Sequence, residues 1–149
     1  MYHVGVVVPE IEGAQVHFTE LLGTVWGPIV RSDLDVRGGD GTDRVVSIRS
    51  CYSTAAPYLE LIEETPGTTW VCNEHSNLHH IGFFSDNLVA DSSSLTAARC
   101  PLELCGRDAT PGPAIFAYHR DPLGVRIEYL DAALRPTMEE FIFRPAENT

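Results

Sequence analysis

The sequence of 149 residues contains no lysine, and all ten of its basic residues are arginine. Without lysine the chain cannot form a Schiff base with a carbonyl substrate, and it lacks the lysine of a phosphate-binding loop. Its 21 acidic residues give a formal net charge of −11 at pH 7. Because this charge repels nucleic acids and anionic membrane surfaces, we expect neither as a partner and predict a small-molecule substrate.

The sequence also lacks any apolar run long enough to predict a membrane-spanning helix, and its N-terminus lacks the pattern of a signal peptide. The four cysteines, Cys51, Cys72, Cys100 and Cys105, do not have the spacing of a disulfide framework. We therefore predict free thiols and a cytoplasmic location. The alternative for the cysteines is a zinc site formed by Cys72, His75, Cys100 and Cys105, although their spacing is irregular.

Two apolar segments each carry a histidine two residues before a glycine. His3 precedes Gly5 in the first segment, and His80 precedes Gly82 in the second. Both segments are typical of buried strands, in which residues two apart share a face, so each histidine should have open space beside it.

Each half of the chain then ends on an apolar strand with a glutamate at its centre. Glu60 lies within residues 58–62, and Glu128 lies within residues 125–130. Two halves of similar length that each open on a histidine and close on a glutamate indicate an internal duplication.

The expected elements follow the order strand, helix and three strands, twice over. In the first half they span residues 2–8, 14–22, 26–30, 45–52 and 58–63, and in the second half residues 78–84, 90–99, 101–105, 115–119 and 125–130. This order predicts an α+β fold with a mixed sheet. We expect one domain over residues 1–149, with a first module at about 1–66, a second at about 78–131 and a C-terminal tail at 132–149.

The candidate site consists of the two histidines and the two glutamates of these strands. Its members are His3, Glu60, His80 and Glu128. A carboxylate within an apolar strand is costly unless it is paired or bound to a metal, and convergence on one divalent cation would explain all four residues. Two imidazoles and two carboxylates suit Zn, Ni, Co, Mn, Mg or Fe. The alternative is that Glu60 and Glu128 pair with Arg49 and Arg126 on solvated faces while the histidines are structural.

Four stretches of the sequence resemble the vicinal oxygen chelate superfamily, which includes glyoxalase I, methylmalonyl-CoA epimerase, extradiol dioxygenases and bleomycin-resistance proteins. The stretches are residues 2–9 (YHVGVVVP), 59–63 (LELIE), 78–83 (LHHIGF) and 121–128 (DPLGVRIE). The resemblance implies two βαβββ modules that form a U-shaped mixed sheet around a metal cleft. By position it assigns the metal ligands to the same four residues, His3, Glu60, His80 and Glu128.

The resemblance implies a divalent-metal-dependent, glyoxalase-like lyase, isomerase or epimerase. The metal would chelate two neighbouring oxygens of a small carbonyl substrate, and a proton would move through a metal-stabilised enediolate. The catalytic base would be Glu60, Glu128 or a metal-bound hydroxide. Ser47 lies where methylmalonyl-CoA epimerases carry a catalytic glutamate, which argues against that particular substrate.

Two other functions are compatible with the same resemblance. An Fe(II) extradiol-type dioxygenase would use only His3, His80 and Glu128, and either Tyr118 or His119 could assist, because these two face opposite sides of a strand. A non-catalytic binding protein of the resistance type would need no metal.

Members of the family pair modules within or between chains. The tail of this chain is expected to contain one helical turn at residues 138–141, and Phe141 and Phe143 should dock the tail on the body or on a partner chain. These features predict a homodimer.

Overall fold

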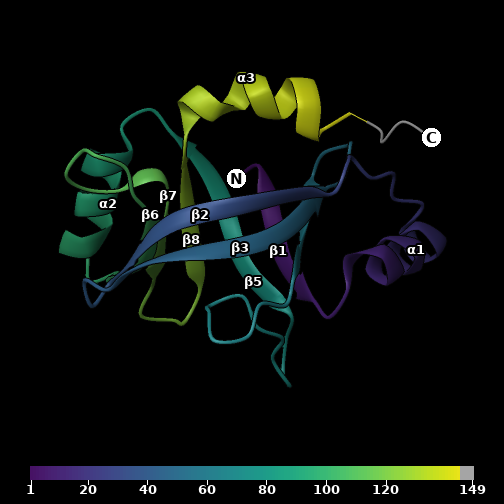
Figure 1. Ribbon diagram of the computed structural model, residues 1–149, viewed down its shortest axis with the longest axis horizontal. Helices are drawn as coiled ribbons and strands as arrows, with labels where there is room; N and C mark the ends of the chain where they lie inside the picture. Colours follow the sequence, from purple (N-terminus) through teal and green to yellow (C-terminus); the bar gives the residue numbers. More distant parts are fainter. Residues whose placement is uncertain (145–149) are drawn as a thin grey trace. The chain divides into compact units, whose positions relative to one another are not determined.

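The structure is a computed structural model that describes residues 1–144 (Figure 1). In chain order its elements are β1 (His3–Val8), α1 (Ile11–Leu22), β2 (Val30–Gly38), β3 (Asp43–Tyr52), β4 (Tyr58–Glu63), β5 (Leu78–Ser85), α2 (Leu88–Ala97), β6 (Leu102–Gly106), β7 (Ala114–Arg120), β8 (Arg126–Asp131), η1 (Ala132–Leu134), α3 (Arg135–Thr137) and η2 (Met138–Ile142). The expected order of strand, helix and three strands is present in both halves, so the α+β class with a mixed sheet is confirmed. Within the described residues no helix has the length and apolar character needed to cross a membrane.

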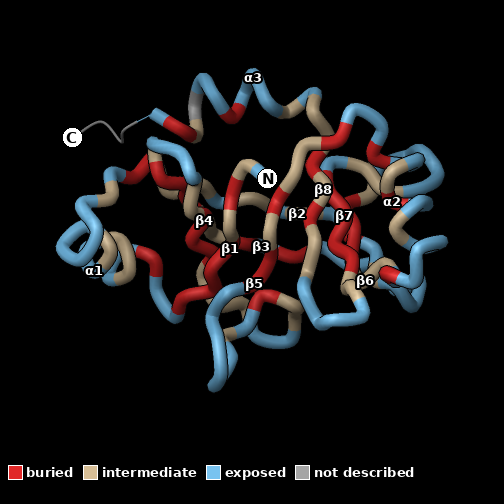
Figure 2. Tube along the Cα trace, turned by 180° about the vertical axis from the view of Figure 1, so that it is seen from behind, coloured by how far each residue is buried: buried red, intermediate tan, exposed pale blue. Residues whose placement is uncertain are grey.

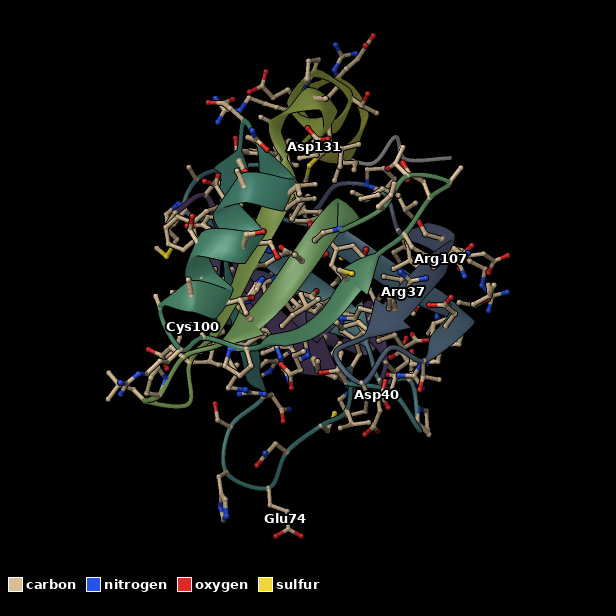
Figure 3. The ribbon with its side chains drawn as sticks, turned by 90° about the vertical axis from the view of Figure 1, so that its left-hand side faces the viewer. Arg37, Asp40, Glu74, Cys100, Arg107 and Asp131 are labelled. Carbon is tan, nitrogen blue, oxygen red and sulfur yellow. The ribbon has the colours of Figure 1, made fainter. Side chains whose placement is uncertain are left out.

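The strand expected at residues 26–30 is displaced toward the C-terminus, because β2 begins at Val30 and runs to Gly38. A tight connection of residues 39–42 joins it to β3. Arg37 Nε donates to Asp43 Oδ1 at 2.7 Å across this connection. Arg107, which lies close to Arg37 in Figure 3, also binds Asp43, at 2.9 Å.

The chain folds as two compact units. The β1/β4 unit contains residues 2–32 and 47–79 and the C-terminal residues from Pro136, and the β5/β8 unit contains residues 33–46 and 80–135 together with Met1. The boundary differs from the expected module boundary because the far end of the β2–β3 hairpin joins the second half. There β2 pairs antiparallel with β6, with Val36 opposite Gly106.

In the β1/β4 unit, β1 pairs in parallel with β4, and β4 pairs antiparallel with β3. Helix α1 begins three residues earlier than expected, because the Glu10 carboxylate accepts hydrogen bonds from the backbone N–H groups of Glu12 and Gly13. Gly23 ends the helix with a φ of 69°. One face of the strands packs under this helix in a core formed by Val6, Val8, Ile11, Trp26, Cys51 and Leu61. The residues that alternate with this core, including His3 and Glu60, therefore leave the strands on the other face.

In the β5/β8 unit, β5 pairs in parallel with β8, and the order continues antiparallel through β7 to β6. Helix α2 packs on β6, β7 and β8, over a core that includes Leu88, Cys105 and Ala117. Because Ala117 faces the helix, its neighbour Tyr118 faces the opposite side, together with Glu128, which lies opposite Tyr118 in the ladder. Figure 2 shows runs of buried residues along β1, β4 and β7.

The C-terminal segment docks on the β1/β4 unit. The helical turn expected at residues 138–141 is present within η2, and the Phe143 ring stacks on Tyr58 with 4.1 Å between ring centres. Phe143 also contacts the edge of Tyr52 at 5.5 Å. Phe143 thus docks on its own chain, whereas the side chain of Phe141 lies outside what the structure describes.

Candidate metal centre

The parallel pairing of β1 and β4 brings His3 to Glu60. His3 lies opposite Tyr58 in the ladder, and Glu60 follows two residues later on the same face. His3 Nε2 is 3.3 Å from Glu60 Oε2, and both side chains are buried. The Tyr52 ring covers the imidazole from the side, with 5.5 Å between ring centres.

The parallel pairing of β5 and β8 brings His80 to Glu128 in the same way. His80 Nε2 is 3.2 Å from Glu128 Oε2, and both side chains are again buried. The Tyr118 ring lies beside the imidazole, with 5.1 Å between ring centres.

A glycine stands directly opposite each glutamate. Gly5 is the ladder partner of Glu60, and Gly82 is the ladder partner of Glu128. Since glycine has no side chain, each glutamate has room beside it for the imidazole that precedes the glycine by two residues. The two pairs of parallel strands thus have the same register at the histidine, the glycine and the glutamate, as the expected duplication requires.

The alternative places the two glutamates on solvated faces, and in this respect it is wrong. Arg49 donates to Glu63 at 2.6 Å and also binds Glu12. Arg126 donates to Glu103 at 2.7 Å. Glu60 and Glu128 lie on buried faces rather than on solvated ones.

The two histidine–glutamate pairs together supply two imidazoles and two carboxylates. Such a buried group of His3, Glu60, His80 and Glu128 could hold a metal ion. A set of two imidazoles and two carboxylates suits first-row divalent ions.

The family model of the Glyoxalase/Bleomycin resistance protein/Dioxygenase superfamily matches residues 2–118. The chain belongs to this superfamily. A solved methylmalonyl-CoA epimerase from Mycobacterium tuberculosis is similar over 91% of this chain and 89% of its own length, with 18% identity and a TM-score of 0.59. A variant of the Streptomyces coelicolor methylmalonyl-CoA epimerase in complex with 2-nitronate-propionyl-CoA covers 88% and 95%, with 15% identity and a TM-score of 0.55.

A hypothetical protein from Bacillus halodurans is similar over 87% of this chain and 91% of its own, with 14% identity and a TM-score of 0.54. At these identities the likeness to solved structures establishes the fold alone. Among curated proteins no match is found.

In this member of the superfamily the four cysteines are free thiols, as expected. Within residues 1–144 the group that could hold a metal contains no cysteine. Burial raises the pKa of the Cys51 thiol to about 11 although Gln15 Nε2 donates a hydrogen bond to its sulfur at 3.2 Å. This thiol is therefore protonated at neutral pH and is a poor nucleophile.

Tyr118 and His119 lie on opposite faces of β7, as the alternation of strand side chains requires. Tyr118 faces His80 and Glu128, whereas His119 is fully buried on the side of α2. His119 Nδ1 donates to the carbonyl oxygen of Cys100 at 2.8 Å, and Nε2 is 2.8 Å from Ser92 Oγ. Burial lowers the pKa of His119, although the bond to the Cys100 carbonyl raises it. Of the two candidates, only Tyr118 lies on the strand face that carries His80 and Glu128.

Strand β3 supplies Ile48, Ser50 and Tyr52 to the face that carries His3 and Glu60, as the pairing of Tyr52 with Glu60 indicates. Ser47 stands at the position where the resemblance places the catalytic glutamate of epimerases. It is exposed and lies on the opposite face of β3 from Ile48, Ser50 and Tyr52. This part of β3 therefore contributes hydroxyl and apolar groups to that face.

Sequence reasoning missed the aromatic and ionic neighbours of the two pairs. The Tyr52 ring contacts the His3 imidazole. Arg126, which is bound to Glu103, lies over the Tyr118 ring beside His80. The two-residue spacing between Arg126 and Glu128 was the available signal for one of them, since it implies a shared strand face.

Proposed function

We propose that the protein is a divalent-metal-dependent enzyme of the glyoxalase type, a lyase, isomerase or epimerase that acts on a small carbonyl compound with two neighbouring oxygens. The observation that carries the proposal is the repetition of one arrangement. Glu60 is held by His3 and faces Gly5 just as Glu128 is held by His80 and faces Gly82. An equivalent role for both glutamates supports a set of four ligands for one ion.

The donor chemistry supports a first-row transition ion or zinc as the metal. Two imidazole nitrogens favour Zn, Ni, Co or Fe over Mg, while two carboxylates keep Mn within the range. When bound, such an ion polarises the carbonyl group of the substrate and stabilises the charge that develops on its oxygen.

The residues of the chain would hold the substrate dry and accept its proton. Glu60 Oε2 and Glu128 Oε2 are the carboxylate oxygens at the candidate centre, so we assign the general base to one of them. Burial of both residues and the flanking rings of Tyr52 and Tyr118 keep water away from these oxygens. Water exclusion strengthens the electrostatic interactions on which proton transfer depends.

The three-ligand dioxygenase is the second candidate, and Tyr118 beside His80 is the observation that favours it. Such an enzyme would not require Glu60, yet Glu60 is as buried and as closely held by its histidine as Glu128. This equality favours the four-ligand enzyme over the dioxygenase.

The test is metal analysis of the purified protein followed by activity assays. We expect one divalent ion per chain, removable by a chelator, and turnover without oxygen of a small carbonyl substrate such as a hemithioacetal of a 2-oxoaldehyde. Consumption of oxygen that depends on Fe(II) would instead establish the dioxygenase. Substrate binding with no metal requirement would establish a binding protein.

We also propose a homodimer in the cytoplasm. Support for the dimer is the group of exposed apolar residues at the end of α1, Leu21, Leu22 and Val25. Support for the location is the set of free thiols. A monomeric mass at high micromolar concentration in light scattering would contradict the dimer.

A further inference from the structure

Arg126 is a nearly buried cation on the face of the β5/β8 unit that carries His80 and Glu128. Its side chain is 9% exposed, and it lies two residues before Glu128 on β8, so the two side chains leave the strand on one face. In the parallel ladder between β5 and β8, Ile81 lies opposite Ile127. The residues that precede them, His80 and Arg126, are therefore neighbours on adjacent strands. Arg126 thus stands beside His80, on the strand face that carries the His80–Glu128 pair.

Glu103 of β6 fixes the guanidinium at two points. Arg126 Nε donates to Glu103 Oε2 at 2.7 Å, and Arg126 Nη2 donates to Oε1 at 2.9 Å. Two parallel bonds hold the plane of the group as well as its position. Arg120 Nη2 also donates to Glu103 Oε1, at 3.0 Å, but the Arg120 side chain is 39% exposed. Burial by itself raises the pKa of Glu103, but the hydrogen bonds from Arg126 and Arg120 lower it to about 2.

Tyr118 connects this clamp to His80. The central carbon of the Arg126 guanidinium lies 5.9 Å from the centre of the Tyr118 ring, which is within the range of a cation–π contact. The centre of the same ring is 5.1 Å from that of the His80 imidazole. Tyr118 is thus packed between a fixed cation and a candidate metal ligand.

We propose that Arg126 is a positioning residue of the metal centre, which holds the Tyr118 ring against the His80 imidazole so that Nε2 stays directed toward Glu128. A histidine that binds a metal depends on neighbours that fix the orientation of its ring. The effect of Arg126 on metal binding therefore rests on the proposed function, in which His80 is a metal ligand. An ion pair with one nearly buried partner contributes little net stability, so we assign the role of the Arg126–Glu103 pair to orientation rather than to folding energy.

The chain offers a matched control for the ion pair. Arg120→Gln removes one guanidinium from Glu103 without touching the ring of Tyr118. Arg126→Gln removes both the bond and the contact with the ring, and Arg126→Lys restores the charge near the ring but not the two-point clamp. Tyr118→Leu removes the ring and leaves the bonds between Arg126 and Glu103 in place.

Titration with Co²⁺, followed by its visible absorption, measures the effect on metal affinity. Loss of an outer partner of a ligand typically weakens metal binding by about 10- to 100-fold, which is the change expected for Arg126→Gln and for Tyr118→Leu. Arg126→Lys should recover part of the loss. Arg120→Gln should bind Co²⁺ with the affinity of the wild type and give the same absorption spectrum.

The nitrogen and carbon resonances of the His80 ring give a second measurement in the metal-free protein. We expect them to move in Arg126→Gln and Tyr118→Leu and to keep their wild-type positions in Arg120→Gln. Wild-type Co²⁺ affinity together with unmoved His80 resonances would overturn the proposal and leave Arg126 as a strut between β6 and β8. If the wild-type protein binds no Co²⁺, the proposed function fails, and the His80 resonances decide the positioning role alone. If Arg126→Gln does not fold, Arg126→Lys, which keeps the charge but not the two-point clamp, provides the test, with a partial loss of Co²⁺ affinity and moved His80 resonances as the expected result.

Discussion

Gly82 lies directly opposite Glu128 in the parallel ladder between β5 and β8. The glycine leaves the space through which the His80 side chain, two residues earlier on the same face, reaches the carboxylate at 3.2 Å. A side chain at this position would compete with the imidazole for that space.

We therefore expect Gly82→Val to separate His80 from Glu128 and to weaken binding of a divalent ion by at least about 10-fold, the usual cost of disturbing the surroundings of a metal ligand. Calorimetric titration with Zn²⁺ measures this change. Ile81→Val, on the opposite face of the same strand, is the control and should leave the affinity unchanged. Unaltered Zn²⁺ binding by a folded Gly82→Val protein would contradict the importance of this space.

The two glutamates of the candidate centre can be tested as general bases. Glu60→Gln and Glu128→Gln keep the shape of the side chain and an oxygen ligand but remove basicity. If proton transfer is the reaction, both variants should lower kcat, and the one that removes the general base should lower it by about 100- to 10,000-fold. Metal occupancy should fall much less in each. Steady-state kinetics beside metal analysis checks this.

Glu63→Gln is the matched control for these variants, because Glu63 lies on the same strand as Glu60 but binds Arg49 instead. It should retain wild-type kcat. Full activity of Glu60→Gln on an identified substrate would contradict the four-ligand enzyme and favour the dioxygenase, in which Glu128→Gln alone loses iron.

His119 should contribute a pH-dependent part of the stability. Because burial lowers its pKa in the folded state, the folded protein binds this proton less readily than the unfolded chain does. The contribution is therefore complete above the unfolded pKa of about 6.5 and is lost as the pH falls through the lower folded value. Denaturant unfolding between pH 7.5 and pH 5 should give a smaller loss of stability for His119→Asn than for the wild type.

The same variant loses part of the bonding with Ser92 and the Cys100 carbonyl, which should lower the free energy of unfolding at pH 7.5 by about 1–3 kcal/mol. His17→Asn, at an exposed position of α1, serves as the comparison. If the stability of the wild type and of His119→Asn depended on pH in the same way, His119 would not be the source of the pH-dependent stability.

The docking of the C-terminal segment depends on Gly27. A Cβ atom at this position would lie 1.9 Å from the carbonyl oxygen of Ile142, so Gly27→Ala should displace the segment. Phe143→Ala, which removes the ring stacked on Tyr58, should have the same effect, and each change should cost about 1–3 kcal/mol of stability. Limited proteolysis should then cut near Arg144 faster in both variants, while Leu22→Ala, on the exposed side of α1, should be cut at the wild-type rate.

The sequence by itself determined the elements that carry the candidate site. Strand alternation is a local property, so the spacing of His3 from Gly5 and of His80 from Gly82 was sufficient to predict buried strands with one open face each. The repeated order of elements was sufficient to predict the α+β class, and the motifs were sufficient to indicate the family.

Only the tertiary structure decided the partners of the long charged side chains. Arg49 binds Glu63 and Glu12, and Arg126 binds Glu103 at two points. These choices depend on which strands are neighbours and which faces they share, and a spacing along the chain contains neither. The length of β2 was decided in the same way, because the bond between Arg37 and Asp43 forms only when the hairpin closes. The pairing of the strands thus decided which of several possible carboxylate partners each arginine binds, because the sequence alone does not distinguish them.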